Sequence, residues 1–148
     1  MKRRDFIKNG CAACLSISAL PLMVSGCAAL SNTTGKLVKD GLMLSVDDFR
    51  IKDKSSSAYR SFIVIRNEAL KYPICVYRFN DTQYAALWMK CAHQGAELQA
   101  SGSYLQCPAH GSEFNNRGLT KTGPAIAGLR TFPVQIENNQ LKISLKAI

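Results

Sequence analysis

Both histidines of the chain and two of its six cysteines fall in two short segments, and these residue types bind transition metals. The first segment places Cys91 two residues before His93, and the second places Cys107 three residues before His110. A glycine follows each pair within two residues, and Pro108 stiffens the second segment. Two thiolates and two imidazoles satisfy either a tetrahedral zinc ion or an iron–sulfur cluster with mixed ligands. We therefore expect these four side chains to form one metal site.

The spacing of the ligands distinguishes these two kinds of site. Structural zinc sites usually pair Cys with Cys and His with His across about two to four residues, whereas here each segment mixes one cysteine with one histidine. The arrangement C-x-H, thirteen residues, C-x-x-H resembles the motif of the Rieske 2Fe-2S proteins. The resemblance implies a Rieske-type 2Fe-2S cluster, in which each loop gives one Cys to the inner iron and one His to the outer iron. A structural zinc-binding domain remains the alternative.

The resemblance extends beyond the four ligands, over roughly residues 46–145. Ser112 follows Gly111, and the resemblance implies that its hydroxyl donates to a bridging sulfide of the cluster. The segment 123–125 resembles the proline-containing third loop that covers the cluster in this family. We therefore count Ser112 among the cofactor-binding residues.

Three positions differ from the family members that oxidise quinols in cytochrome bc complexes. Those members usually carry a further cysteine in each loop and join the two in a disulfide, but here the positions are Ala96 and Ala109. High-potential members also carry a tyrosine two residues beyond the serine, where this chain has Phe114. One hydroxyl donor is kept at Ser112 and the other is lost. We therefore expect a reduction potential below that of the quinol oxidases and above that of the dioxygenase ferredoxins.

The elements that must position these loops are short strands. From about residue 42 onward the chain repeats runs rich in Val, Ile, Tyr and Phe that end at turn residues, without an amphipathic helical run. This pattern predicts an all-β fold, which the resemblance specifies as a Rieske-type domain of small antiparallel sheets with two cluster-binding loops. Polar turns at 80–83 and 138–139 predict two hairpins. The expected strands are 61–66, 74–79, 84–90, 97–100, 104–106, 113–114, 129–136 with an interruption at Pro133, and 141–145.

The N-terminus has the pattern of an export signal. A basic segment at 2–8 precedes an uncharged and largely apolar stretch at 9–35. The arginine pair in the basic segment, with the apolar pair that follows it, resembles a twin-arginine signal, which exports proteins already folded. Residues 24–27 resemble a bacterial lipobox, in which Cys27 is lipidated on its sulfur and becomes the first residue of the mature protein.

These signals predict three parts of the chain. A twin-arginine and lipoprotein signal peptide occupies 1–26, a lipidated N-terminus and flexible tether occupies 27–41, and the Rieske domain occupies 42–148. The alternative is an uncleaved transmembrane helix, because residues 10–30 are long and apolar enough to span a bilayer. Either anchor tethers an exported domain to a membrane on its periplasmic side.

Composition limits the remaining function classes. The 148 residues supply one domain of ordinary size, which excludes a multidomain enzyme. The formal net charge is +9, and the basic residues after residue 8 form no run, so we expect acidic partners or anionic surfaces but no nucleic acid. Outside the N-terminal segment only three cysteines remain, which cannot form a closed set of disulfides. We expect one of them, Cys75, to be a buried hydrophobic residue because it lies in an apolar run.

The sequence shows no nucleophile–base pair and no histidine outside the two loops, so we expect an electron carrier or an oxidoreductase subunit rather than an enzyme alone. The leading function is a membrane-tethered, extracytoplasmic Rieske electron-transfer protein that passes single electrons through its exposed histidine edge. Its expected partners are redox proteins, such as a cytochrome or a quinol-linked membrane complex. The alternative within the family is the iron–sulfur subunit of a quinol-oxidising cytochrome bc-type complex. Phe114 and the two alanines count against that alternative.

Overall fold

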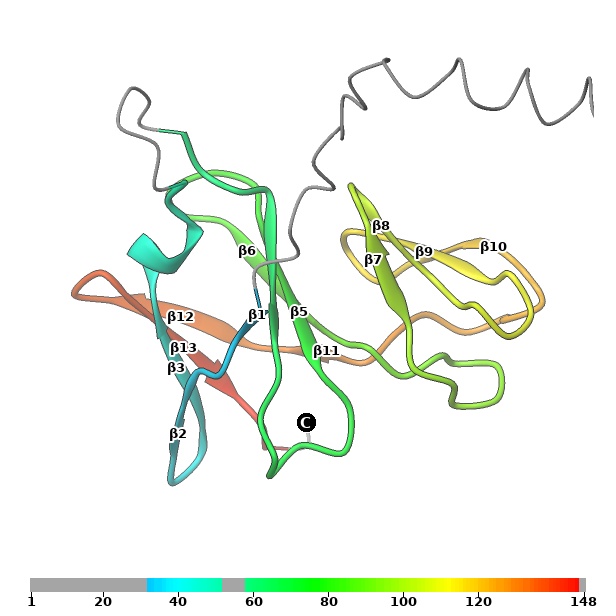
Figure 1. Cartoon of the computed structure of the whole chain (residues 1–148), viewed down its shortest axis with the longest axis horizontal. Helices are drawn as coiled ribbons and strands as arrows, with labels where there is room; N and C mark the ends of the chain where they lie inside the picture. Colours follow the sequence, from blue (N-terminus) through cyan, green and yellow to red (C-terminus); the bar gives the residue numbers. More distant parts are fainter. Residues whose placement is uncertain (1–31, 52–57, 147–148) are drawn as a thin grey trace, which may run out of the picture.

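The computed structural model describes residues 32–51 and 58–146, and within these ranges short strands form three sheets. Figure 1 shows the first sheet in the centre of the view, the second sheet on the left and the third sheet on the right. One short 3-10 helix, η1 (Val46–Phe49), follows a strand of the second sheet. The predicted all-β fold with small antiparallel sheets is confirmed.

The first sheet has the strand order β1-β4-β5-β6-β11. β4, β5 and β6 are antiparallel neighbours, and β1 pairs with β4 in parallel. Alternate residues of β4 enter two different cores, because Ile63 and Ile65 pack in one core and Val64 packs in the other. Burial on both faces accounts for the continuous apolar runs in these strands. The bounds are β1 (Asn32–Thr33), β4 (Phe62–Ile65), β5 (Ile74–Arg78), β6 (Tyr84–Trp88) and β11 (Thr131–Phe132).

The second sheet has the strand order β12-β13-β3-β2. Its hairpin β12–β13 turns at Asn138 and Asn139, whose φ angles are 50° and 61°. Left-handed backbone at both central residues defines the type I′ turn that matches the twist of a hairpin, so the turn predicted at 138–139 is confirmed. The bounds are β2 (Lys36–Val38), β3 (Gly41–Ser45), β12 (Val134–Glu137) and β13 (Gln140–Ser144).

The third sheet, drawn mainly in yellow in Figure 1, has the strand order β10-β9-β8-β7. It positions both candidate metal loops, because the loop with Cys91 precedes β7 and the loop with Cys107 joins β8 to β9. The bounds are β7 (Gln99–Ser101), β8 (Tyr104–Gln106), β9 (Glu113–Asn115) and β10 (Thr120–Thr122).

Two hydrophobic cores fill the spaces between the sheets. The first core joins the first and second sheets and includes Leu42 and Leu141. The second core joins the first and third sheets and buries Phe114 together with Cys91 and Cys107. The two cysteines of the candidate metal site are therefore held in the apolar interior between two sheets.

Two of the expected strands differ in the structure. The run 129–136 is interrupted at Pro133 as expected, but its two parts, β11 and β12, lie in different sheets. Proline has no N–H for either ladder, so it fits the point where the chain leaves one sheet for the other. The expected strand 97–100 begins at Gln99, and Glu97 forms only an isolated bridge with Lys90. The other expected strands are confirmed to within about two residues at each end.

The flexible tether expected at 27–41 is wrong for its second half. Asn32 pairs with Val64 at the edge of the first sheet, and Leu37 pairs with Leu42 in the second sheet. Short edge strands obtain their hydrogen bonds from a neighbouring strand and need little apolar surface, so strands of two and three residues show no strand pattern in the sequence. The folded domain therefore includes residues 32–41, which precede the expected boundary at 42.

The expected signal peptide at 1–26 and the lipidation site Cys27 lie outside the described residues. Within the described ranges, no helix is long and apolar enough to cross a membrane.

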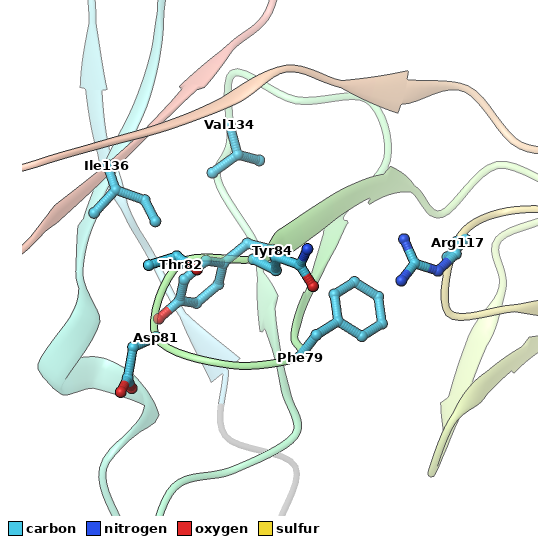
Figure 2. Close-up of a pocket in the computed structure, with 8 residues that line it drawn as sticks. Phe79, Asp81, Thr82, Tyr84, Arg117, Val134 and Ile136 are labelled. Carbon is cyan, nitrogen blue, oxygen red and sulfur yellow. The ribbon is translucent and has the colours of Figure 1, made fainter.

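A cavity of about 620 Å³ lies where the β5–β6 turn faces β12. Figure 2 shows Phe79, Tyr84, Arg117 and Ile136 among the side chains around it, and the Arg117 guanidinium lies 4.5 Å from the centroid of the Phe79 ring. None of the candidate metal ligands lines this cavity. It is therefore separate from the candidate metal centre.

Candidate metal centre

The two candidate metal loops close in the same way. The N–H of Cys91 donates to the carbonyl of Ala96 at 2.8 Å, and the N–H of Cys107 donates to the carbonyl of Ser112 at 2.8 Å. Each bond joins the first and sixth residues of its loop. The structure therefore presents the two cysteines from equivalent positions of two similar turns.

A glycine with left-handed backbone allows each loop to turn. Gly95 has a φ of 77° and Gly111 has a φ of 76°, values that strain other residues. The Gly95 N–H donates to the Cys91 carbonyl at 2.9 Å, and the Gly111 N–H donates to the Cys107 carbonyl at 3.0 Å. These bonds fold each loop tightly behind its cysteine.

The thiols of Cys91 and Cys107 meet in the core, where each residue is only 2% exposed. The Cys91 S–H donates to the sulfur of Cys107. Burial raises the pKa of Cys91, and backbone hydrogen bonds from His93 and Gln94 to its sulfur counteract part of this rise. The contact places both sulfurs within reach of one metal ion.

Cys107 carries the more acidic thiol of the pair. Burial acts to raise its pKa, but hydrogen bonds from the Cys91 thiol and from the backbone of Ala109 and His110 outweigh it, so the pKa of Cys107 is lowered. Each cysteine therefore has two backbone donors from the residues two and three positions after it. These donors are suited to hold a thiolate, and side-chain types alone did not reveal them.

The two imidazoles meet beside the sulfur pair. The ring centroids of His93 and His110 are 5.0 Å apart, with an angle of 86° between the ring planes. The Nδ1 atom of His93 is buried and has no hydrogen-bond partner among the described residues. A buried nitrogen without a partner is costly unless a ligand binds it. His110 is exposed, so the imidazole end of the site reaches the surface.

The donor set fits a binuclear group. The sulfurs form one pair and the imidazoles form another, whereas a single zinc ion needs all four donors around one point. Within the described ranges, no three His, Cys, Asp or Glu side chains converge on one position for a metal ion. In a Rieske centre two thiolates hold one iron and two imidazoles hold the other, and the residues present match this division.

Ser112 connects the second loop to the segment 123–125. Its side chain is fully buried, and its Oγ accepts a hydrogen bond from the Ala125 N–H at 3.0 Å. Because the oxygen acts as the acceptor in this bond, the hydroxyl proton remains available for donation to another group. The contact with Ala125 was not expected from the sequence beyond the resemblance of 123–125 to a covering loop.

Three positions differ from the family members that oxidise quinols, and they lie in the two metal loops and in β9, which follows the second loop. Ala96 and Ala109 occupy the two loops, and Phe114 is fully buried in the core under the third sheet.

Cys75 is also fully buried, and burial raises its pKa to about 12, so the expectation of a buried apolar cysteine is confirmed. All three cysteines of the described residues are free.

Comparison with known families matches this site to one of them. The Rieske 2Fe-2S domain family matches residues 51–133, which is more than half of the chain. The chain belongs to the Rieske 2Fe-2S family, and a Rieske-type 2Fe-2S cluster is its cofactor. The domain is an electron-transfer domain. None of the curated proteins matches the chain.

Two solved structures are similar to the chain. The cyanobacterial plasma membrane Rieske protein PetC3 from Synechocystis PCC 6803 is 28% identical with a TM-score of 0.50, and the match covers 57% of this chain and 86% of that chain. The Sphingomonas yanoikuyae B1 ferredoxin is 26% identical with a TM-score of 0.45, and the match covers 58% of this chain and 86% of that chain. The first of these likenesses confirms the Rieske fold.

Proposed function

We propose that the protein is a membrane-tethered, extracytoplasmic Rieske protein that passes single electrons between redox partners. The observation that supports this function best is the contrast in exposure between the two ends of the donor set. Cys91 and Cys107 are each 2% exposed, whereas His110 lies at the surface. The bound cluster would take up and release one electron at a time. A partner can approach the imidazole end without disturbing the sulfur end.

Four side chains hold the cluster in this proposal. Cys91 and Cys107 hold the inner iron, and His93 and His110 hold the outer iron. The thiol contact in the core and the unpartnered Nδ1 of His93 support these assignments. Thiolates, not thiols, bind metal, so the backbone donors to each sulfur favour the binding state.

Metal analysis of paired variants tests the ligand assignments. The protein produced with iron should contain iron and acid-labile sulfide in equal amounts and be coloured. Cys107→Ser should lose both, whereas Cys75→Ser should keep both, because Cys75 lies in β5 and belongs to neither metal loop. Stoichiometric zinc in the wild-type protein, or full sulfide content in Cys107→Ser, would refute the assignments.

The membrane tether rests on the resemblance of 24–27 to a lipobox and on the likeness to a plasma membrane Rieske protein. We propose that Cys27 carries the lipid and that the exported domain faces the periplasmic side. The mass of the protein extracted from membranes tests this, since it should correspond to a chain that begins at a lipidated Cys27. Cys27→Ser should retain the unprocessed N-terminus. An intact Met1 in the wild-type protein would instead support the uncleaved transmembrane helix.

A further inference from the structure

Basic and aromatic side chains form a cluster beside the first metal loop. We call Lys71, Tyr72, Trp88, Lys90 and Arg130 the basic aromatic patch. Tyr72 and Trp88 meet edge to face, with centroids 5.3 Å apart. Lys90 Nζ lies 5.2 Å from the Trp88 centroid and 5.9 Å from the Tyr72 centroid. The Arg130 guanidinium lies 5.7 Å from the Trp88 centroid, and Lys71 Nζ lies 5.9 Å from that of Tyr72.

The three positive charges of this patch have no carboxylate partner among the described residues. Arg130 donates only to the carbonyl of Leu145, at 3.5 Å. Glu97 forms a backbone bridge with Lys90, but its carboxylate pairs with Arg66 at 2.6 Å. The side chains of the three basic residues are exposed, whereas the two rings are half-buried. Cation–π contacts therefore hold three unneutralised cations over one aromatic surface.

The patch continues into the candidate metal centre. The residues that line a cavity of about 380 Å³ include Trp88, Lys90 and Arg130 of the patch and His93 of the first metal loop. The first loop packs closely here, since a Cβ added at Gly95 would lie 3.1 Å from Lys90 Cε. Two of the three charges of the patch, Lys90 and Arg130, therefore line the same cavity as His93.

We propose that the basic aromatic patch docks an acidic surface of a redox partner protein, so that the electron passes at the His93 side of the site. This inference rests on the proposed electron-transfer function. Protein interfaces typically have an aromatic centre and a charged rim. Unpaired charges of one sign attract a partner protein of the opposite sign and speed its approach. A concave site beside a proposed ligand also suits a protruding protein surface better than a flat bilayer.

Electron transfer to two proteins of opposite charge tests the proposal. Reduced protein is mixed in a stopped-flow instrument with the acidic copper protein plastocyanin or the basic mitochondrial cytochrome c. In each reaction one electron leaves the Rieske protein and reduces Cu(II) to Cu(I) or ferric haem to ferrous haem. The patch variant is Lys71→Gln/Arg130→Gln. The matched control is Lys36→Gln/Lys142→Gln, which removes the same charge from exposed positions in the second sheet.

At low ionic strength the patch variant should reduce plastocyanin about tenfold more slowly than wild type, and the control variant should lose much less. Added salt should remove the difference, and the rate with cytochrome c should not fall in the patch variant. Carbodiimide cross-linking, which joins lysine amines to carboxylates, should link plastocyanin to Lys71 or Lys90. That readout does not depend on electron transfer.

Three results would overturn the docking surface. Equal losses in the two variants would show a general charge effect. Cross-links elsewhere on the domain would place the contact on another face. Binding of phosphatidylglycerol vesicles lost only in the patch variant, with plastocyanin kinetics unchanged, would assign the patch to lipid headgroups. If no cluster forms at all, the proposed function fails first, and the metal analysis above detects that separately.

Discussion

The Ser112 hydroxyl oxygen accepts a 3.0 Å hydrogen bond from the backbone N–H of Ala125, and both residues are buried. This bond joins the second metal loop to the segment that follows β10, which is distant from the loop in the sequence. The same serine is the one hydroxyl donor to the cluster that the family resemblance retains. We therefore propose two separable roles for this side chain, a structural one toward Ala125 and an electronic one toward the bound cluster.

Ser112→Ala should affect both roles. The reduction potential should fall, because a hydrogen bond to a cluster sulfur stabilises the additional negative charge of the reduced state. The domain should also lose about 1–3 kcal/mol of stability, because the buried Ala125 N–H loses its acceptor. A redox titration and thermal unfolding measure the two effects.

Ser103→Ala is the matched control, since Ser103 is exposed in the turn between β7 and β8. Neither its potential nor its stability should change. If Ser112→Ala loses stability but keeps the wild-type potential, then Ser112 has only the structural role.

Phe114→Tyr should raise the reduction potential. High-potential relatives carry a tyrosine at this position, and its hydroxyl would add a donor to a cysteine sulfur near the cluster. Phe114 is fully buried in the same core as Cys91 and Cys107, so the new hydroxyl enters an apolar environment. If it finds no acceptor there, the potential will stay constant and stability will fall by about 1–3 kcal/mol, which would contradict the prediction.

Gly111→Ala should reduce the cluster content of the purified protein. An added Cβ has open space around it, so the cost comes from the left-handed backbone and amounts to about 1–2 kcal/mol. The matched control is Gly102→Ala, which also has positive φ and open space but lies in the β7–β8 turn. Both variants should lose similar stability, and only Gly111→Ala should lose iron. Equal iron loss in both would show that cluster content follows overall stability.

Cys75 should make the folded state less stable at high pH. Burial raises its pKa to about 12 from an ordinary 9.0, so the thiol ionises in the unfolded chain before it can ionise in the folded protein. Its contribution is fully present below about pH 9 and is lost as the pH rises toward 12, by as much as about 4 kcal/mol.

Denaturant unfolding between pH 8 and pH 12 of wild type and Cys75→Ala measures this contribution. The variant should show a shallower decline of the unfolding free energy. Part of the decline will remain, because burial also raises the pKa of Tyr77. Parallel declines in the two proteins would show that Cys75 does not titrate differently on folding.

The residue types of the four candidate ligands point to a metal site, because few residue types bind iron or zinc and both histidines of the chain are among the four. Their spacing identified Cys91, His93, Cys107 and His110 as one group, and the structure brings the thiols and the imidazoles together in pairs. The hairpin turn at 138–139 was predictable for a similar reason, because asparagine tolerates left-handed backbone.

Other features depend on contacts that the local sequence does not encode. β1 and β2 form because β4 and β3 offer free edges, although the two strands have only two and three residues of their own. The switch of sheets at Pro133 depends on where β6 and β13 lie. The basic aromatic patch combines residues from three separate segments, so neither a charge run nor a motif revealed it.

An EPR-monitored redox titration of the full-length protein produced with iron tests the central claim most directly. We predict a rhombic signal from the reduced cluster with a midpoint in the middle or lower part of the Rieske range, which spans about −150 to +300 mV. A midpoint near the top of that range would favour the quinol-oxidising subunit over the electron carrier. Folded protein that gives no reduced-cluster signal would contradict the account.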